Sequence, residues 1–311
     1  MLISIIIPCY NEEQVIAETY KRLTDVMQNL PHKYELIFVN DGSRDNTLAI
    51  LQNFSKKDQR VKVLSFSRNF GHQAAITAGL NYCNGDYAVT IDGDLQDPPQ
   101  VILGMLETMK AENANIVYAV RKKRDGEPRW RLIAIKLFYR ILNKLSDIHI
   151  PVDTGDFRLV DRKVIDQFNA LEEKNKYIRG LMYWMGFKQV PFYYDREARF
   201  AGETKYPFGK LLKLALTGIF YFSKKPLNIA TSLGFVSIVL GLCYVLWALI
   251  SMIFGFGYAI SGWTSTIVLI VFFGGVQLLT IGVLGKYIGN LFDEVKGRPE
   301  YIVNEKINFD E

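Results

Sequence analysis

The sequence predicts an α/β protein in which a mostly parallel sheet, covered by helices, is followed by two membrane-spanning helices. Apolar strand-like runs alternate with helical segments from residue 2 to about residue 120. Polar residues, several of them acidic, stand at the ends of these runs. Farther along, no Asp, Glu, Lys or Arg occurs between residues 226 and 285, which is typical of membrane segments. A soluble head and a membrane region are therefore expected in one chain.

The head is predicted from its alternating periodicities. Short runs rich in Ile, Val and Phe indicate strands, and segments with helical spacing of apolar residues indicate helices. The predicted strands are 2–8, 34–40, 61–67, 87–91 and 116–119. The predicted helices are 12–29, 46–58, 71–82 and 99–112. Such alternation favours parallel strands with helices on both faces, and ligands then bind beyond the carboxyl ends of the strands.

Two windows of the uncharged segment, 229–254 and 266–284, reach the ~20 apolar residues that a bilayer-spanning helix requires. The two spans are expected at about 229–254 and 266–287. Positive charges flank both windows, and the connector between them has none. The flanking residues are Lys224, Lys225, Lys286, Lys296 and Arg298. Because positive flanks stay in the cytoplasm, both termini are expected there. The N-terminus has no signal-peptide pattern. We therefore expect a cytoplasmic head, 1–225, a two-helix region that spans the cytoplasmic membrane, 226–290, and a cytoplasmic tail, 291–311.

A basic stretch begins at Arg121 and continues into a segment, 130–145, with the apolar spacing of an amphipathic helix. An interfacial helix on the bilayer and a core-facing helix with a solvated basic side both fit the periodicity; the two later spans favour the interface. A second interfacial helix is predicted over 206–225, before the first span. Lipid headgroups or phosphates are the natural partners of these charges. We expect no nucleic acid partner.

The predicted strand 87–91 stops on a group of carboxylates, Asp92, Asp94 and Asp97. Alternating carboxylates at the carboxyl end of a buried strand suit a hard divalent cation such as Mg²⁺ or Mn²⁺. We therefore interpret Asp92 and Asp94 as metal ligands, against the alternative of a polar turn. Asp97, followed by two prolines, is interpreted as the N-cap of the next helix.

Other polar residues follow the first two predicted strands, at Tyr10, Asn11 and Glu12 and at Asp41. Asp41 has the alternative of a turn followed by a helix cap. The chain contains neither a G-x-G-x-x-G nor a G-x-x-x-x-G-K-[ST] pattern, so a dinucleotide fingerprint and a P-loop are absent. The histidines, His32, His72 and His149, lack ligand spacing and are assigned no metal.

Two later segments carry further candidates. Asp156 is either a buried acid or a loop carboxylate paired with Arg158. Arg199 and Lys205 bound a polar cluster that could hold a phosphate, with a solvated loop as the alternative.

These motifs together resemble the family 2 glycosyltransferases with the GT-A fold. Within that family, the chain resembles the group that acts on polyprenyl phosphates, which includes dolichyl-phosphate mannose synthase and bacterial bactoprenol glucosyltransferases. The resemblance rests on Pro8-Cys-Tyr-Asn-Glu12, Val39-Asn-Asp41-Gly-Ser43, Arg68-Asn-Phe-Gly71, Asp92-Gly-Asp94-Leu-Gln96-Asp97-Pro-Pro99 and Arg199-Phe-Ala-Gly-Glu-Thr-Lys205.

The resemblance implies a role for each motif. It places the nucleotide-sugar donor at Pro8, Tyr10, Asn11, Glu12, Asp41 and Asp92. It places the metal at Asp92, Asp94 and Gln96, with Asp94 also catalytic. It places the acceptor phosphate at Arg199 and Lys205, with Arg121 and Arg124 as further candidates. It makes Asp156 the candidate base.

The expected reaction is therefore transfer of a sugar, with glucose from UDP-glucose as first choice, to a polyprenyl phosphate with inversion. A processive polysaccharide synthase is one alternative, but it needs a translocation channel of several helices. A non-enzymatic nucleotide-binding scaffold or flippase component is another, and it predicts polar residues lining a path through the membrane. Glycines on both spans would permit close helix packing, so a homo-oligomer is compatible with the sequence.

Overall fold

The computed structural model describes all residues except 122–153, 175, 196–219, 221–222, 255–261 and 310–311. The described residues belong to two compact units. The first, called the head, lies within 1–139, 149–208 and 297–311. The second, called the helical unit, lies within 140–148 and 209–296. The C-terminal residues therefore return to the head after the helical unit.

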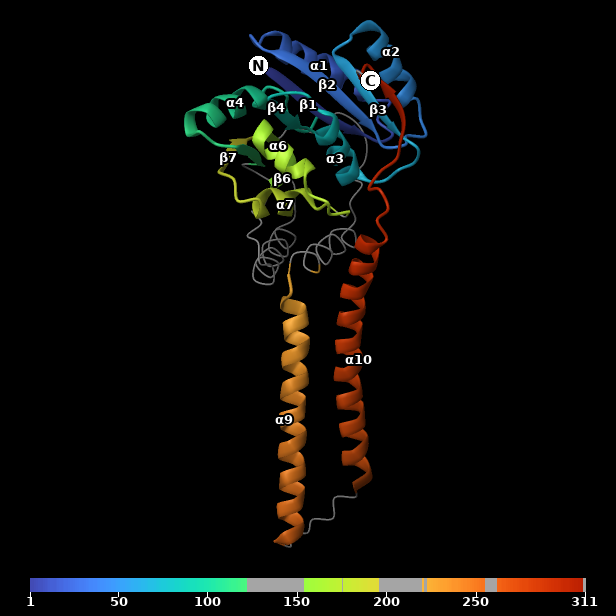
Figure 1. Cartoon of the computed structure of the whole chain (residues 1–311), viewed down its shortest axis with the longest axis vertical. Helices are drawn as coiled ribbons and strands as arrows, with labels where there is room; N and C mark the ends of the chain where they lie inside the picture. Colours follow the sequence, from blue (N-terminus) through green and yellow to red (C-terminus); the bar gives the residue numbers. More distant parts are fainter. Residues whose placement is uncertain (122–153, 175, 196–219, 221–222, 255–261, 310–311) are drawn as a thin grey trace. The chain divides into compact units, whose positions relative to one another are not determined.

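The described part of the head contains a mixed sheet with the strand order β7-β5-β6-β4-β1-β2-β3-β8 (Figure 1). The strands are β1 (Leu2–Cys9), β2 (Lys33–Asn40), β3 (Val61–Phe66), β4 (Tyr87–Thr90), β5 (Ile116–Arg121), β6 (Thr154–Asp161), β7 (Gln189–Tyr194) and β8 (Val303–Ile307). The pairs β1–β2, β1–β4, β2–β3 and β5–β7 are parallel, whereas β6 and β8 run antiparallel to their neighbours. The expected mostly parallel sheet is confirmed.

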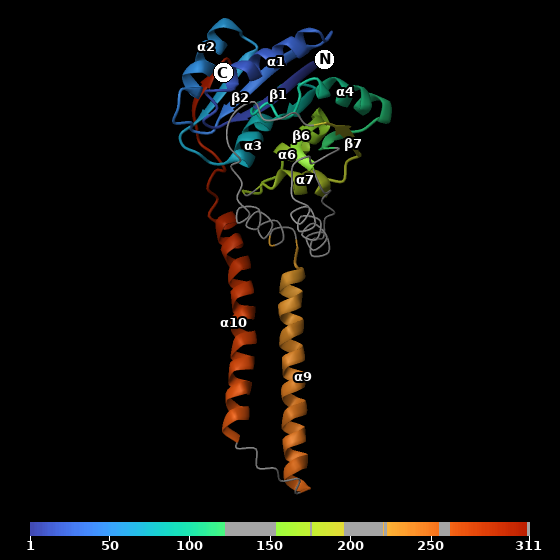
Figure 2. The same cartoon turned by 180° about the vertical axis from the view of Figure 1, so that it is seen from behind.

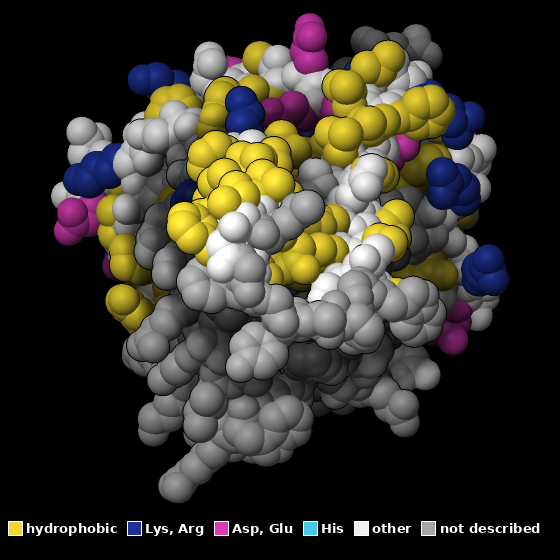
Figure 3. All heavy atoms as spheres, turned by 90° about the horizontal axis from the view of Figure 1, so that it is seen from below, with side chains coloured by type: hydrophobic (Ala, Val, Ile, Leu, Met, Phe, Trp, Pro, Cys, Tyr) yellow, Lys and Arg dark blue, Asp and Glu magenta, His cyan; other side chains and the backbone are white. Residues whose placement is uncertain are grey.

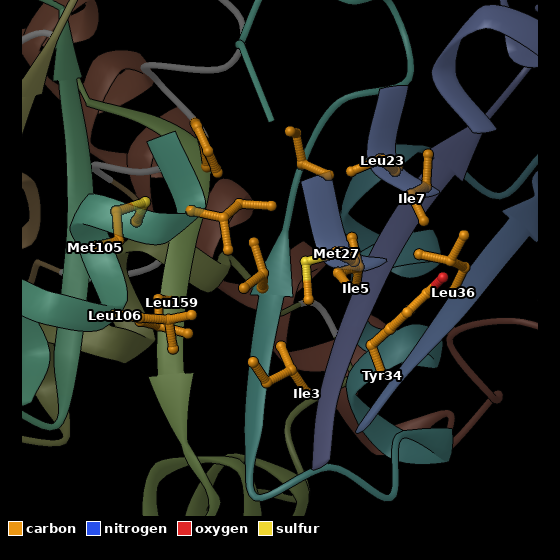
Figure 4. Close-up of a cluster of buried hydrophobic side chains, with 14 of the residues drawn as sticks. Ile3, Ile5, Ile7, Leu23, Met27, Tyr34, Leu36, Met105, Leu106 and Leu159 are labelled. Atoms are coloured by element: carbon orange, nitrogen blue, oxygen red, sulfur yellow. The ribbon is translucent and has the colours of Figure 1, made fainter. Parts of the chain in front are cut away.

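Helices pack on both faces of this sheet. Those of the head are α1 (Ile16–Gln28), α2 (Thr47–Lys57), α3 (His72–Tyr82), α4 (Val101–Glu112), α6 (Arg162–Asn169) and α7 (Ile178–Trp184). Successive strand residues point to opposite faces, and β1 shows the result. Ile5 packs with Leu23 and Met27 of α1 in one cluster (Figure 4), whereas Ile6 meets α3 at Gly79.

Three described strands were not predicted, and each has a local reason. β6 contains a glycine, two aspartates and an arginine, so it lacks an apolar run. β7 contains Pro191, which lowers strand propensity. β8 is only five residues long and has an asparagine and two charged residues between Val303 and Ile307, which fits an edge strand. β8 lies within 291–311, where the sequence indicated only a tail.

The helical unit contains α9 (Lys225–Ile253) and α10 (Gly262–Val295), which lie side by side in both views (Figures 1 and 2). Within them, Lys225–Ser251 and Ser265–Val295 are long and apolar enough to cross a membrane, with mean hydropathies of 2.4 and 2.5. Their apolar side chains are largely exposed, and hydrophobic side chains gather at the centre of the view in Figure 3. The two expected apolar helices are confirmed.

The predicted interfacial helix 130–145 lies outside the described residues, as does most of 206–225. Within the helical unit, Tyr287 of α10 donates a hydrogen bond to the Ser223 carbonyl oxygen at 2.6 Å. A Cβ on Gly241 of α9 would lie 3.1 Å from the ring of Phe273 on α10, so this small residue allows the helices to approach closely.

Candidate active site

The loops that follow β1 and β2 are joined by hydrogen bonds. The Asn11 amide donates to Ser43 Oγ at 3.0 Å, and the Asn11 side-chain oxygen accepts from the Arg44 amide at 2.8 Å. The Glu12 amide donates to Thr47 Oγ1 at 2.9 Å. Asn11, with a positive φ of 54°, and Glu12 thus belong to the loop between β1 and α1. The helix α1 begins at Ile16, four residues later than the predicted helix 12–29.

The predicted donor residues on this loop differ in exposure. Pro8 is buried inside β1, in register with Val39 of β2. Tyr10 is 36% exposed, and Asn11 and Glu12 are at least partly exposed. Tyr10 therefore offers a ring surface on which a nucleotide base could stack. The donor role of these residues stays a prediction.

Asp41, another predicted donor residue, joins the ends of β2 and β3. Its carboxylate accepts hydrogen bonds from the Phe70 amide at 2.6 Å and from the Gly71 amide at 3.0 Å. The side chain is buried, and burial raises the pKa of Asp41 although both amides oppose this. The N-cap of α2 is Asn46, so Asp41 is not a helix cap. It fixes the loop that leads into α3.

Gly42 allows the loops after β2 and β3 to touch, and its substitution provides the first test. Its φ is +64°, and a Cβ would lie 2.4 Å from the Arg68 carbonyl carbon. Gly42→Ala should therefore lower the thermal stability of the head, because positive φ alone costs about 1–3 kcal/mol and the clash adds to it. Gly186→Ala is the matched control, since Gly186 has a φ of +71° and open space around it. Equal melting temperatures for the two variants would contradict this close packing.

A cluster of charged side chains lies where β4 and β6 meet the first turn of α3. His72 Nε2 lies 3.5 Å from Asp92 Oδ1 and 3.3 Å from Asp156 Oδ2. Burial opposes the charged imidazole, but Asp92 and Asp156 outweigh it and raise the pKa of His72 to about 9. His72 is therefore a cation at neutral pH, between two acids that are distant in sequence.

Asp156 is a buried acid on β6, and its main partner is Arg179 of α7. Arg179 Nε and Nη2 donate to the two carboxylate oxygens at 2.8 and 3.0 Å, and Gln73 Nε2 donates at 3.2 Å. Burial would raise the pKa of Asp156, but Arg179 and His72 hold it well below its usual range. The alternative placed Asp156 in a loop, paired with Arg158. Asp156 lies in β6 instead, and Arg158 Nη2 does form an ion pair with its Oδ1, at 3.9 Å, which is longer than the pair with Arg179.

The sequence indicated that Asp97 caps the next helix, and this prediction is wrong. Asp97 is buried and accepts a hydrogen bond from the Tyr194 hydroxyl of β7, while Arg121 Nη2 lies 3.8 Å from its Oδ1. The N-cap of α4 is Gln100. The two prolines after Asp97 delay the helix, which frees its carboxylate to face β5 and β7. Arg121, a predicted phosphate ligand, thus stands at the end of β5 beside an acid.

The predicted metal site gathers negative charge. Burial, helped by the charges of Asp97, Asp156 and Asp94, raises the pKa of Asp92 to about 6 against the opposing charge of His72. A divalent cation would relieve this repulsion, so the donor set fits Mg²⁺ or Mn²⁺. Among the described residues, no group of three or more His, Cys, Asp and Glu side chains could hold a metal ion.

Gln96, the third predicted metal neighbour, donates its backbone amide to Asp94 Oδ1 at 3.1 Å. Between them Leu95 is buried with a positive φ of 58°, an uncommon conformation for a bulky residue. Strain of this kind gathers at functional sites, where the surrounding structure holds it. The turn after β4 is thus fixed in one shape.

Three predicted phosphate ligands, Arg124, Arg199 and Lys205, lie outside the described residues. Conversely, sequence reasoning missed His72 and Arg179 as site residues. His72 directly follows the Arg68-Asn-Phe-Gly71 motif at a strand end, and that position could have indicated it. Arg179 carries no such signal, because only the packing of α7 brings it to Asp156.

Comparison with known proteins places this site in a family. The model of "Glycosyl transferase family 2" matches residues 4–168, which include most of β1, the strands β2 to β6, and Asp92, Asp94 and Asp156. The chain belongs to the family 2 glycosyltransferases and is a glycosyltransferase.

Individual relatives extend the similarity over the whole chain. It is 51% identical to the glycosyltransferase YkcC of Bacillus subtilis, over 97% of this chain and 93% of the relative. It is 39% identical to the SfII prophage-derived bactoprenol glucosyl transferase of Shigella flexneri, over 98% of both chains. Among solved structures it is similar to glucosyl-3-phosphoglycerate synthase from Mycobacterium tuberculosis, with 18% identity, a TM-score of 0.49 and coverage of 70% and 76% of the two chains.

Proposed function

We propose that this glycosyltransferase moves a sugar from a nucleotide sugar to a polyprenyl phosphate at the cytoplasmic face of the membrane. Glucose from UDP-glucose is the first choice of donor. The observation that carries the proposal is the carboxylate cluster of Asp92, Asp94 and Asp156 at the strand ends, in a chain that also has two helices of membrane-spanning length. The full-length similarity to a bactoprenol glucosyl transferase supports a lipid acceptor.

On the donor side, Tyr10, Asn11 and Glu12 would bind the nucleoside, and Asp41 would hold the loops around it. Asp92 and Asp94 would hold a divalent cation, which acts as a Lewis acid on the leaving diphosphate. The protonated His72, beside Asp92, would add a positive charge near the leaving diphosphate, which gains negative charge as its bond to the sugar breaks.

On the acceptor side, Arg121 and, outside the described residues, Arg124, Arg199 and Lys205 would hold the lipid phosphate. A phosphate oxygen attacks the anomeric carbon, and the bond from that carbon to the diphosphate breaks with its electron pair on the departing nucleotide. The attack is in line, so the sugar is inverted. Holding two anions together against their repulsion is the main task of these cations.

Asp156 is better suited to orient its neighbours than to remove a proton. Its oxygens already accept from Arg179 and Gln73, and its low pKa makes it a weak base. A phosphomonoester with a second pKa of about 6 is largely ionised at neutral pH and needs no strong base. We therefore propose that Asp156 positions His72 and Arg179, a change from the role that the family resemblance implied.

The experiment uses the purified full-length chain, a panel of radiolabelled nucleotide sugars and polyprenyl phosphate, with and without EDTA. We expect lipid-linked label from UDP-glucose, its loss in EDTA, and an anomeric configuration opposite to that of the donor. A long polymer would indicate the processive synthase. Nucleotide binding without transfer from any donor would favour the scaffold, and retention of configuration would contradict single displacement.

A further inference from the structure

The segment after α10, residues 300–309, is bound along the edge of the head's sheet. Its strand β8 pairs antiparallel with β3, and it lies beside β3 in Figure 1. Side chains add to this pairing: Gln52 Nε2 donates to the Glu305 carboxylate at 3.1 Å, and Asn308 Nδ2 donates to the Ser55 and Val61 carbonyl oxygens at 2.8 and 2.9 Å. The segment is therefore an integral part of the head.

The first residues of this segment hold the loop that follows β3. The Ile302 carbonyl oxygen accepts a hydrogen bond from the Ser67 amide at 3.1 Å. The ring of Tyr301 stacks on Phe66, with centroids 5.0 Å apart and an interplanar angle of 13°. Phe66 in turn meets Phe70 edge to face at 5.7 Å. The contacts thus run from the C-terminal segment into the loop 67–71.

That loop is the one that carries site residues. The amides of Phe70 and Gly71 bind the Asp41 carboxylate, which lies among the predicted donor residues. The next two residues, His72 and Gln73, contact the Asp156 carboxylate at 3.3 and 3.2 Å. A displacement of the loop would therefore move both the donor side of the site and the acidic cluster.

The same segment is also fixed to the helix on the other side of the loop. Glu300 Oε1 accepts a hydrogen bond from Thr77 Oγ1 at 3.1 Å, and the Tyr301 hydroxyl accepts from Asn81 Nδ2 at 2.8 Å. Both donors lie on α3, whose first turn carries His72. The C-terminal segment thus contacts the strand before the loop and the helix after it, and Tyr301 takes part in both contacts.

We propose that residues 300–302 are a positioning element of the active site, with Tyr301 as the principal positioning residue. They hold the loop 67–71 between β3 and α3, so that Asp41, His72 and Gln73 keep the geometry in which the nucleotide sugar binds. The effect on donor binding rests on the proposed function, whereas the effect on the loop does not.

The test compares Tyr301→Ala with Phe309→Ala in the full-length protein. Phe309 is the matched control because it lies on the same segment but contacts Tyr82 and Lys62, away from the loop. We expect Tyr301→Ala to raise the KM for UDP-glucose and the Kd for UDP about 5- to 10-fold, because the free energy of one aromatic contact is lost. The change in kcat should be smaller. Hydrogen exchange should rise at residues 67–73 in this variant. Phe309→Ala should lower the melting temperature without either effect.

Equal effects of the two variants on KM and exchange would overturn the proposal, because the segment would then act only through overall stability. Unchanged exchange at 67–73 in Tyr301→Ala would also overturn it. If Tyr301→Ala does not fold, Tyr301→Leu keeps the apolar bulk and removes the stacking, and the same readouts apply. If the wild-type chain transfers no sugar, the proposed function fails, while the exchange comparison still decides whether Tyr301 positions the loop.

Discussion

Replacing Asp94 by asparagine is expected to lower the transfer rate on the order of 10²- to 10³-fold, the effect of removing one group that stabilises charge in a transition state. Asp94 is partly exposed, and asparagine keeps an oxygen that can accept from the Gln96 amide. The turn after β4 should therefore keep its shape while the site loses one negative ligand. The loss should appear as reduced transfer at every metal concentration and as a higher metal concentration at half-maximal rate.

Asp86→Asn is the control for this prediction. Asp86 also accepts a hydrogen bond from a backbone amide, that of Leu2, at 2.7 Å, and it lies before β4 instead of after it. The substitution removes the same charge from the head and should leave both the rate and the metal dependence unchanged. Wild-type transfer by Asp94→Asn would refute the metal role of this carboxylate.

Removing the Asp156 carboxylate is expected to be the most destabilising single change in the site. Asp156→Ala removes the carboxylate that contacts Arg179 and that lies 3.9 Å from the buried Arg158, and breaking a buried pair costs about 3–5 kcal/mol. For a domain of this size, the melting temperature should fall on the order of 10 °C. Transfer should fall with it, because His72 loses one of its two acidic neighbours.

A double variant separates the ion pair from other effects of Asp156. Asp156→Asn combined with Arg179→Gln removes both charges, so its melting temperature should fall by less than the sum of the two single variants. Additive losses would show that the pair is not coupled. Asp156→Ala with the stability of the wild type would contradict the buried ion pair.

The pH dependence of stability follows from the same pair. The folded-state pKa of Asp156 is lowered, so the unfolded chain binds the proton more tightly than the folded chain. The stabilisation is therefore fully present above the ordinary aspartate pKa of about 3.9 and is lost as the pH falls below it. As the pH falls below about 3.9, the difference in melting temperature between wild type and Asp156→Asn should therefore shrink. A difference that stays the same between pH 5 and pH 3 would contradict the lowered pKa.

Local patterns in the sequence were sufficient for much of the fold. The five predicted strands and four predicted helices all occur, because each is a continuous run with the period of its own secondary structure. The two apolar helices were equally evident, since composition alone distinguishes them. β6 was missed because its charged residues interrupt the apolar pattern, and their cost is offset by partners such as Arg179 that lie elsewhere in the chain.

Some features of the candidate site could likewise be predicted from the sequence, and others could not. The sequence by itself determined that carboxylates follow β4, because strand ends and acidic motifs are local features. Only the tertiary structure decided that Asp97 faces Tyr194, that His72 stands between Asp92 and Asp156, and that β8 returns to the edge of the sheet. The physical reason is that a periodic pattern records which face of an element is buried, whereas the partner of a buried charge depends on how distant elements pack.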